Sequence, residues 1–496
     1  MSIETFNDNM IQKRTYNNMS FEEFCIGFDN ELGEIKKAFF PLKKDKKRLM
    51  FFSAHWFTGG VERFLSNLLP TLCLKYDIYL VTVETEFESA IKIPEAVSSI
   101  KVSEKVFYDK YDYALLALAY VYEIDVAIGC INLFNKVLDF YSLARHLNIK
   151  TIASNHEYYF YAYENHHFYP YVNKRVEVYK NIDAAVWETN FSAYVYNNYN
   201  SNGYVIPNPN TYEINAGHIE SKKEKIVLCI GRFNDHINVK RIDRVLLCFS
   251  KVLTKVPDAI LILIGKCDMN LPFIGSEELT ILQFLNKLGI PEKNLRFADS
   301  VESVSVYYKK ASVLIKASNS EGFPMVINEA ACFGVPAVCN YIPGLEDIIT
   351  EGENGYLPLQ DDIDSMAEHV CNILTDNELR IRLSKNAAAL AERFSAEKVG
   401  AQWEFLLETI TSDRSNDEIS SKLRNKLNKS AIASEQNSKN LCFELNKVID
   451  IFCTNTYVEQ ISVCQECVNL KRTLSWRITR PLRAVGKVLH SLKIIP

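Results

Sequence analysis

Two glutamates eight residues apart, Glu321 and Glu329, are the side chains whose types and spacing most clearly suggest chemistry. They lie in the stretch SEGFPMVINEA, in which Pro324 suits the first turn of a helix and Gly334 suits the end of that helix. This spacing predicts that Glu321 lies in the loop before the helix and Glu329 on the helix. The N–H groups of a first helical turn favour an anion. Because ionised carboxylates accept hydrogen bonds from vicinal diols, the pair fits a ligand with phosphate and hydroxyl groups, such as a nucleotide sugar.

Two cations are expected at the same edge of the sheet as the glutamates. Arg232 follows Gly231 at the end of a predicted strand, and Lys240 stands at the head of the next predicted helix. Breaking a sugar–diphosphate bond leaves negative charge on the diphosphate, which fixed cations can stabilise without a metal. Surface ion pairs would explain either residue alone, so the interpretation rests on both residues together.

The N-terminal half offers a glycine pair and a histidine for the same purpose. Gly59 and Gly60 follow the first predicted strand, and without a Cβ atom they let a donor or acceptor approach the backbone closely. His156 follows another strand and could hydrogen-bond the donor sugar or the acceptor, with a structural histidine as the alternative. The aromatic run Tyr158–Tyr171 favours packing or a lid over an acceptor platform.

The elements that must position these residues are two series of short apolar strands that alternate with helices. Such alternation predicts two doubly wound parallel sheets, an α/β architecture. The strands of the first sheet are expected at Leu49–Trp56, Ile78–Val83, Val126–Cys130, Thr151–Ser154 and Ala184–Trp187. The strands of the second sheet are expected at Ile226–Ile230, Ile260–Ile264, Leu295–Ala298, Val313–Lys316 and Ala337–Asn340. Because ligands of such sheets bind beyond the carboxyl ends of the strands, a cleft between the two domains is the expected site.

This rhythm predicts five segments along the chain. They are residues 1–45 as a helical lead-in, 46–207 as an N-terminal Rossmann-like acceptor domain, 208–394 as a C-terminal Rossmann-like donor domain, 395–411 as a closing helix, and 412–496 as a polar linker and basic tail. In the lead-in, Ser20 and Glu23 can form a capping box for an amphipathic helix. Asp361 and Asp362 follow the last strand and are expected to start a helix rather than to bind a metal.

The composition excludes several classes of protein. The 496 residues are 48% hydrophobic and 24% charged, which is typical of globular proteins and not of disordered, collagen-like or coiled-coil chains. The formal net charge of −5 argues against nucleic acid as the main partner. Thirteen scattered cysteines suit a reduced, intracellular protein. Cys464 and Cys467 form a CxxC without a second ligand pair, so no zinc site is expected.

The C-terminal tail differs in charge from the rest of the chain. Residues 471–496 carry seven Lys or Arg side chains and no acid, which leaves a formal net charge of −12 on residues 1–470. Trp476 among these cations suits a membrane interface, so we expect the tail to bind an anionic membrane surface, with a partner protein as the alternative. The sequence shows neither a signal peptide nor an apolar stretch long enough to span a membrane. This predicts a cytoplasmic protein that is peripheral on the inner face of the cell membrane.

Four motifs, taken in order, resemble those of retaining glycosyltransferases of family 4, glycosyl transferases group 1 with the GT-B fold. They are Gly-Arg after a strand, KRID, SxxEGFPMVxxEA and PGLEDIITEGENGY, and the resemblance covers about residues 49–410. It implies that Glu321 contacts the transferred sugar and that Glu329 contacts the ribose hydroxyls. It also implies that Arg232 and Lys240 bind the diphosphate.

The same resemblance extends to backbone groups and to the N-terminal half. It implies that sugar and phosphate are cradled by the backbone at Gly322, Phe323, Met325 and Val326. Gly59 and Gly60 match the family's glycine-rich loop, and His156 matches the family's histidine at the floor of the active site.

The resemblance implies a function. It implies sugar transfer from a nucleotide-diphosphate sugar with retention of configuration, by front-face attack and with neither cofactor nor metal. The ending SWRITRPLR is similar to that of bacterial cell-surface polysaccharide enzymes, which implies a glycan or lipid-linked glycan acceptor in O-antigen, capsule or lipopolysaccharide synthesis. Two alternatives stay open: a sugar or sugar-phosphate synthase of the same fold with a soluble acceptor, and a catalytically silent GT-B subunit that stabilises a partner enzyme.

Overall fold

The computed structural model describes residues 46–86, 89–145, 148–157, 169–197, 200–215, 217, 219, 221, 223–231, 233, 240–266, 279–299, 301 and 303–412. The chain forms two compact units. Of the described residues, those up to Ile206 and those from Gly400 onward form unit 1, and those within Pro207–Val399 form unit 2. The expected lead-in helix with Ser20 and Glu23 and the basic tail lie outside the described residues.

Unit 1 is built on a sheet of seven parallel strands in the order β3-β2-β1-β4-β5-β6-β7. The strands are β1 (Arg48–His55), β2 (Asp77–Val83), β3 (Ser98–Val102), β4 (Val126–Gly129), β5 (Lys150–Asn155), β6 (Ala184–Trp187) and β7 (Gly203–Val205). The helices are α3 (Gly60–Leu72), α4 (Glu104–Val121), α5 (Asn135–Ala144), α7 (Tyr169–Tyr179) and α8 (Asn190–Asn197). Helix α15 (Ala396–Thr411) also belongs to this unit, from Gly400 onward.

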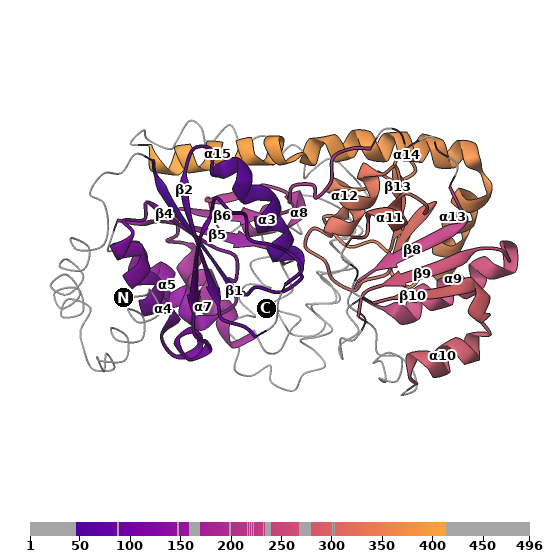
Figure 1. The fold of residues 1–496 in the computed structure, drawn as a ribbon, viewed down its shortest axis with the longest axis horizontal. Coiled ribbons are helices and arrows are strands. Elements are labelled where there is room, and N and C mark those ends of the chain that lie inside the picture. Colours follow the sequence, from indigo (N-terminus) through magenta and orange to yellow (C-terminus); the bar gives the residue numbers. More distant parts are fainter. Residues whose placement is uncertain are drawn as a thin grey trace, which may run out of the picture. The chain divides into compact units, whose positions relative to one another are not determined.

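Helices cover both faces of this sheet (Figure 1). Met50 and Phe52 of β1 belong to the core that α4, α5 and α8 complete on one face. Phe51, between them in sequence, contacts Trp403 of α15, which also contacts Phe64 of α3. This alternation follows from the two-residue period of a strand. Because both faces are buried, the strands read as continuous apolar runs, and this is why the sequence predicts them.

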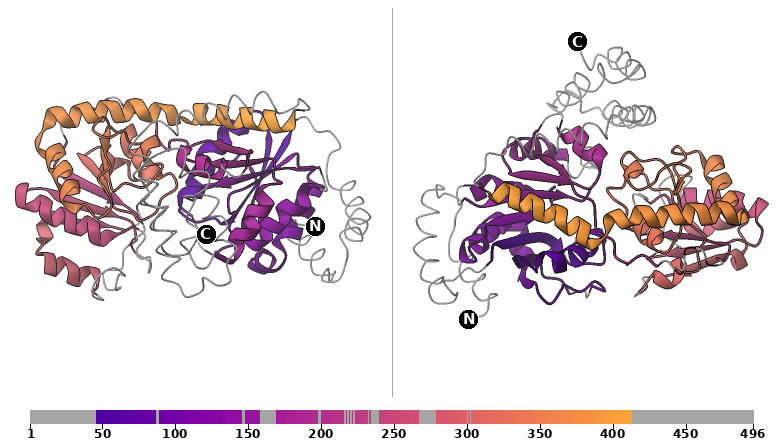
Figure 2. Two further views of the ribbon diagram at one scale, coloured as in Figure 1. Left: turned by 180° about the vertical axis from the view of Figure 1, so that it is seen from behind. Right: turned by 90° about the horizontal axis from the view of Figure 1, so that it is seen from above.

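Unit 2 is built on a sheet of six parallel strands in the order β10-β9-β8-β11-β12-β13. The strands are β8 (Ile226–Ile230), β9 (Ile260–Ile264), β10 (Leu295–Ala298), β11 (Val313–Lys316), β12 (Ala337–Cys339) and β13 (Gly355–Tyr356). The helices are α9 (Ile242–Lys255), α10 (Ile281–Leu288), α11 (Ser305–Tyr308), α12 (Met325–Cys332), α13 (Ile363–Thr375) and α14 (Asn377–Ala391). One core joins the sheet to α9, α10 and α13, and a second core joins its other face to α11, α12 and α14. Figure 2 shows the helices of each unit from two further sides.

The ten predicted strands are all present, with ends within one residue of the prediction. Three further strands, β3, β7 and β13, escaped prediction because they are short edge strands with few apolar residues. Helix α4 begins at Glu104, and charged residues in its first turns interrupt the apolar pattern of the helix. In the part of the chain that the structure describes, no helix is both long and apolar enough to cross a membrane.

Candidate functional site

The SEGFP stretch forms a strand–loop–helix connection in unit 2, as the sequence predicts. It runs from β11 through a loop to α12, whose N-cap residue is Pro324. Gly334 has φ +62 just beyond the end of the helix, a left-handed conformation that glycine adopts without strain. Glu321 therefore lies in the loop at the carboxyl end of β11, and Glu329 lies in the second turn of α12.

Glu321 is held by two lysines. Its Oε1 atom accepts hydrogen bonds from Lys240 Nζ at 2.8 Å and from Lys316 Nζ at 2.7 Å. Burial by itself would raise the pKa of Glu321, but the two ammonium groups outweigh it and lower that pKa to about 2. The side chain is therefore ionised near neutral pH, although only 10% of it is exposed.

Lys316 is a site residue that the sequence analysis missed. It is the last residue of β11, buried in the sheet with 6% exposure. Burial lowers the pKa of Lys316, but the charge and hydrogen bond of Glu321 raise it above its usual value, so the ammonium is charged. The available signal was a charged residue at the end of the apolar run Val-Leu-Ile, where the carboxyl edge of the sheet begins.

Glu329 is held by hydroxyl groups instead of cations. Thr211 Oγ1 donates to its Oε1 atom at 2.6 Å, and Tyr308 Oη donates to its Oε2 atom at 3.0 Å. The glutamate is 5% exposed, and Tyr308 is fully buried. The carboxylate thus already accepts from two hydroxyls, which is the kind of bond that a ribose diol would offer.

The backbone positions expected to cradle the ligand surround this connection. Gly322 and Phe323 lie in the loop before Pro324, and Met325 and Val326 form the first turn of α12. First-turn N–H groups have no partner within a helix, so they point a positive potential out of its N-terminus.

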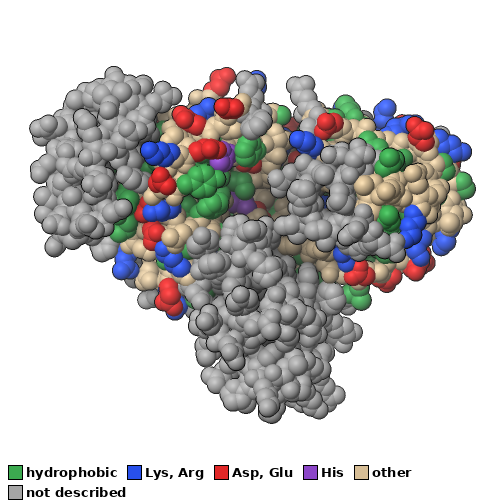
Figure 3. Space-filling model, turned by 90° about the horizontal axis from the view of Figure 1, so that it is seen from below, with side chains coloured by type: hydrophobic (Ala, Val, Ile, Leu, Met, Phe, Trp, Pro, Cys, Tyr) green, Lys and Arg blue, Asp and Glu red, His purple; other side chains and the backbone are tan. Residues whose placement is uncertain are grey.

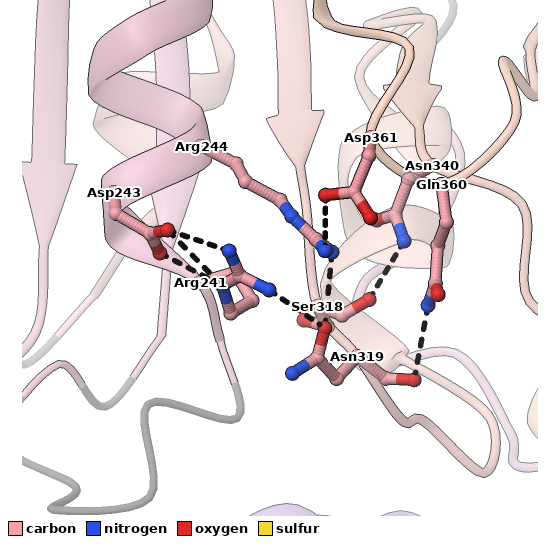
Figure 4. Close-up of polar contacts among 8 residues, drawn as sticks. All are labelled: Arg241, Asp243, Arg244, Ser318, Asn319, Asn340, Gln360 and Asp361. Carbon is pink, nitrogen blue, oxygen red and sulfur yellow. Dashed lines mark hydrogen bonds and ion pairs between the residues drawn. The ribbon is translucent and has the colours of Figure 1, made fainter. Parts of the chain in front are cut away.

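The loop that carries Glu321 is tied to the head of α9, as Figure 4 shows. Arg244 Nη1 donates to Asn319 Oδ1 at 3.0 Å, and Arg241 Nη1 donates to the same oxygen at 3.4 Å. Arg241 is in turn bound through Nε and Nη2 to Asp243, and Arg244 also forms an ion pair with Asp361.

This network ties the loop that carries Glu321 to the backbone segment that carries Lys240. Asn319 is two residues before Glu321, and Arg241 follows Lys240 directly with the left-handed φ of 46°. A Cβ atom on Gly231 would lie 3.5 Å from Lys240 Cγ, so the end of β8 is also close to that lysine. Arg232, which follows Gly231, lies outside the described residues.

Asp362 starts a helix, as predicted. Its side chain accepts from Ser365 N at the N-cap of α13. Within the described residues, no group of three or more His, Cys, Asp or Glu side chains could hold a metal ion.

In unit 1 the glycine pair opens α3. Gly59 is the N-cap residue, and a Cβ atom there would lie 2.7 Å from Glu62 Oε2. A Cβ atom on Gly60 would meet nothing within 4 Å, so the surroundings of this residue leave room for a ligand close to the backbone.

His156 lies at the end of β5 and is engaged by the protein on both ring nitrogens. Nδ1 lies 2.8 Å from Glu188 Oε1, and Nε2 lies 3.1 Å from Ser154 Oγ. Burial favours the neutral ring, but Cys130 and Glu188 outweigh it and raise the pKa of His156 to about 10. The ring is therefore a buried imidazolium, packed 4.5 Å from the ring of Phe64. Glu188, directly after β6, is the second residue that the sequence analysis missed.

A second histidine of unit 1 is more accessible. His55, at the end of β1, stacks on the exposed ring of Phe57 and lies 3.0 Å from Glu104 Oε1. Figure 3 shows a face of the molecule on which histidine, acidic and hydrophobic side chains lie together.

Most of the aromatic run Tyr158–Tyr171, including 158–168, lies outside the described residues.

Comparison with known proteins finds a family match within unit 2. Residues 210–390 match the family model of the glycosyl transferases group 1. N-acetyl-alpha-D-glucosaminyl L-malate synthase of Bacillus anthracis is 30% identical over 200 residues, 40% of this chain and 49% of that protein. Poly(glycerol-phosphate) alpha-glucosyltransferase of Bacillus subtilis is 26% identical over 206 residues, 41% of this chain and 29% of that protein. The chain spans about half the length, or less, of these curated relatives.

Solved structures match the fold of the chain. The crystal structure of HepE from Anabaena in complex with UDP-glucose has a TM-score of 0.58 and 15% identity, over 73% of this chain and 99% of that chain. At this identity the likeness concerns the fold alone, and it confirms the predicted fold class of two Rossmann-like parallel sheets. Residues 210–390 are therefore similar to the glycosyl transferases group 1, and the fold of the chain is GT-B.

Proposed function

We propose that this protein is a retaining glycosyltransferase that moves a sugar from a nucleotide-diphosphate sugar to a glycan acceptor. The observation that carries this proposal is the ionised Glu321 between Lys240 and Lys316, one loop before α12. It lies in the stretch that matches the group 1 family. The UDP-glucose bound to HepE supports the class of donor.

In this proposal unit 2 binds the donor. Glu321 accepts hydrogen bonds from the hydroxyls of the transferred sugar, and Glu329 accepts from those of the ribose. Lys240, Arg232 and the first turn of α12 neutralise the charge that develops on the departing diphosphate, so no metal is required for that task. The departing phosphate takes the proton of the acceptor hydroxyl on the face from which it leaves, and the anomeric configuration is retained.

For the acceptor we propose a lipid-linked glycan of a bacterial cell surface, reached from the inner face of the membrane. The name of the Bacillus subtilis relative, which describes a glucosyltransferase acting on a polymer, supports this, as does the basic tail. Deletion of residues 471–496 should abolish binding to phosphatidylglycerol vesicles and leave donor binding unchanged. Equal vesicle binding by the full chain and the truncated chain would contradict the membrane role.

A small soluble acceptor is the second candidate. It is favoured by the Bacillus anthracis relative, whose name describes a glucosaminyl malate synthase. Transfer to a hydroxy acid in solution that is as fast in the truncated chain as in the full chain would favour this candidate.

The donor site is tested by thermal shift with UDP-, GDP-, ADP- and CMP-sugars in the presence of a chelator. A ligand at 100 times its dissociation constant should stabilise the protein by about 2.7 kcal/mol. We expect one nucleotide class to stabilise the wild type, and Glu329→Ala to abolish that shift. Glu368→Ala, which removes an exposed glutamate from α13 of the same unit, is the matched control and should respond like the wild type.

Two results would count against the proposal. Wild-type turnover in Glu321→Ala or Glu329→Ala would refute the assigned roles. No shift with any of the four classes would favour the silent-subunit alternative.

A further inference from the structure

Lys316 occupies a buried strand position that would normally favour an apolar residue. It ends β11, which lies between β8 and β12 in the sheet, and it is paired in register with Cys339 of β12. The residues before it, Val313, Leu314 and Ile315, are all buried and apolar. Among the described residues, Glu321 is the acceptor that its ammonium reaches.

Stability alone does not account for this lysine. Desolvating an ammonium and a carboxylate costs several kcal/mol for each ion, and a well-packed apolar pair is often at least as stable as a buried ion pair. A charged side chain that is buried beside a candidate binding site therefore indicates that the charge has a function at that site.

The two lysines that bind Glu321 differ in freedom to move. Both donate to Oε1, and the structure gives Oε2 no partner among the described residues. The Lys240 side chain is 25% exposed, whereas that of Lys316 is 8% exposed. Lys240 can therefore turn toward an incoming anion, and Lys316 cannot leave the carboxylate.

We propose that Lys316 is a positioning residue that keeps Glu321 ionised and oriented while Lys240 turns to the diphosphate of the donor. Oε2 then faces the sugar with a full charge on the carboxylate. This inference rests on the proposed donor site.

The surroundings of the pair fix the sign of the pH effect. Lys240 and Lys316 face Glu321, and the thiols of Cys229 and Cys339 lie near Lys316 from the two neighbouring strands. Burial raises the pKa of Cys339 to about 12, so its thiol is uncharged near neutral pH. Without Lys316, burial and the bound diphosphate both raise the pKa of Glu321, so the carboxylate becomes protonated at a higher pH.

The test uses the full chain and measures the dissociation constants of UDP and UDP-glucose by calorimetry between pH 3 and pH 8. If the thermal-shift experiment selects another nucleotide, that nucleotide and its nucleotide sugar replace UDP and UDP-glucose. The variants are Lys316→Met, which fills the buried place without charge, Lys316→Arg, which restores the cation, and Lys240→Met for comparison. The ratio of the dissociation constants of UDP and UDP-glucose isolates the contribution of the sugar to binding. The same measurements on the wild type control for titration of the diphosphate of UDP.

We expect Lys316→Met to bind UDP within about twofold of the wild type at each pH. Its affinity for UDP-glucose should fall as the pH decreases, with a midpoint roughly 1 to 3 pH units above that of the wild type, the range in which a close cation shifts a carboxyl group. Lys316→Arg should restore the wild-type profile. Lys240→Met should weaken both ligands, because it removes a diphosphate contact.

Three outcomes overturn the proposal. A wild-type UDP-glucose profile in Lys316→Met would show that the charge is not needed, and an equal loss of UDP and UDP-glucose would make Lys316 a diphosphate ligand. If Lys316→Met does not fold, Lys316→Gln carries the same test, and failure of both neutral variants to fold would assign the pair to stability. Absence of nucleotide binding by the wild type would instead refute the proposed function.

Discussion

The buried ion pair of His156 and Glu188 should make unit 1 less stable as the pH rises. The pKa of His156 is about 10 in the folded protein, against an ordinary value of 6.5. Because the folded value is the higher one, the stabilisation is complete below pH 6.5 and is lost as the pH rises through about 10. The difference between these two pKa values contributes about 5 kcal/mol to the free energy of unfolding at pH 6 and about 1 kcal/mol at pH 9.

The perturbation is Glu188→Gln, which keeps the size of the side chain and removes its charge. The values above are the upper limit for its effect, because Cys130 also raises the pKa of His156. Glu104→Gln is the matched control, since Glu104 also pairs with a histidine but is 67% exposed. An exposed pair contributes about 0 to 1 kcal/mol, so this variant should stay close to the wild type.

Urea unfolding followed by tryptophan fluorescence reports on unit 1. Trp56, Trp187 and Trp403 are buried in unit 1, and the sequence of unit 2 contains no tryptophan. Glu188→Gln should lower the free energy of unfolding strongly at pH 6 and only slightly at pH 9. An equal loss at the two pH values would refute the assignment of a charged His156.

Two further substitutions test the packing of unit 2. Gly265→Ala should destabilise it by more than about 3 kcal/mol, because φ is +126 and the new Cβ atom would lie 1.9 Å from Gly231 O. Gly289→Ala, with φ +64 and nothing within 4 Å, is its control and should cost about 1 kcal/mol, as calorimetry would show. Tyr308→Phe removes a buried donor to Glu329 and should destabilise unit 2 by about 1.5 to 3 kcal/mol. The tryptophan-monitored unfolding of unit 1 should not change in this variant, and a parallel change there would contradict the reasoning.

The fold was predictable from the sequence where burial is complete on both faces of a strand. β9, with the sequence Ile-Leu-Ile-Leu-Ile, is the clearest case. The edge strand β3 reads Ser-Ser-Ile-Lys-Val, because one of its sides has no neighbouring strand and its exposed positions are polar. A prediction from apolar runs therefore finds the centre of each sheet and misses three of the four edge strands, with β10 as the exception.

The site was predictable only in part, for a different reason. Glu321 and Glu329 stand in one motif, and their local structure follows from Pro324 and Gly334. Their partners come from elsewhere in the chain: Thr211 is 118 residues from Glu329. Glu188 is 32 residues from His156. Only the order of the strands brings such residues together. No local pattern specifies which of the polar residues that follow the strands contact one another.

The two glutamates of the site are held by different kinds of partner, and this difference bears on how a ligand would bind. Lysines hold Glu321, so its negative charge is already balanced before any ligand arrives. Glu329 instead accepts hydrogen bonds from the neutral hydroxyls of Thr211 and Tyr308. Each oxygen of a carboxylate has two lone pairs, so a ribose diol can bind Glu329 beside the hydroxyls of Thr211 and Tyr308. We therefore expect Glu329 to select for a diol, because a ligand without hydroxyls would cover this buried side chain and leave its remaining lone pairs unsatisfied.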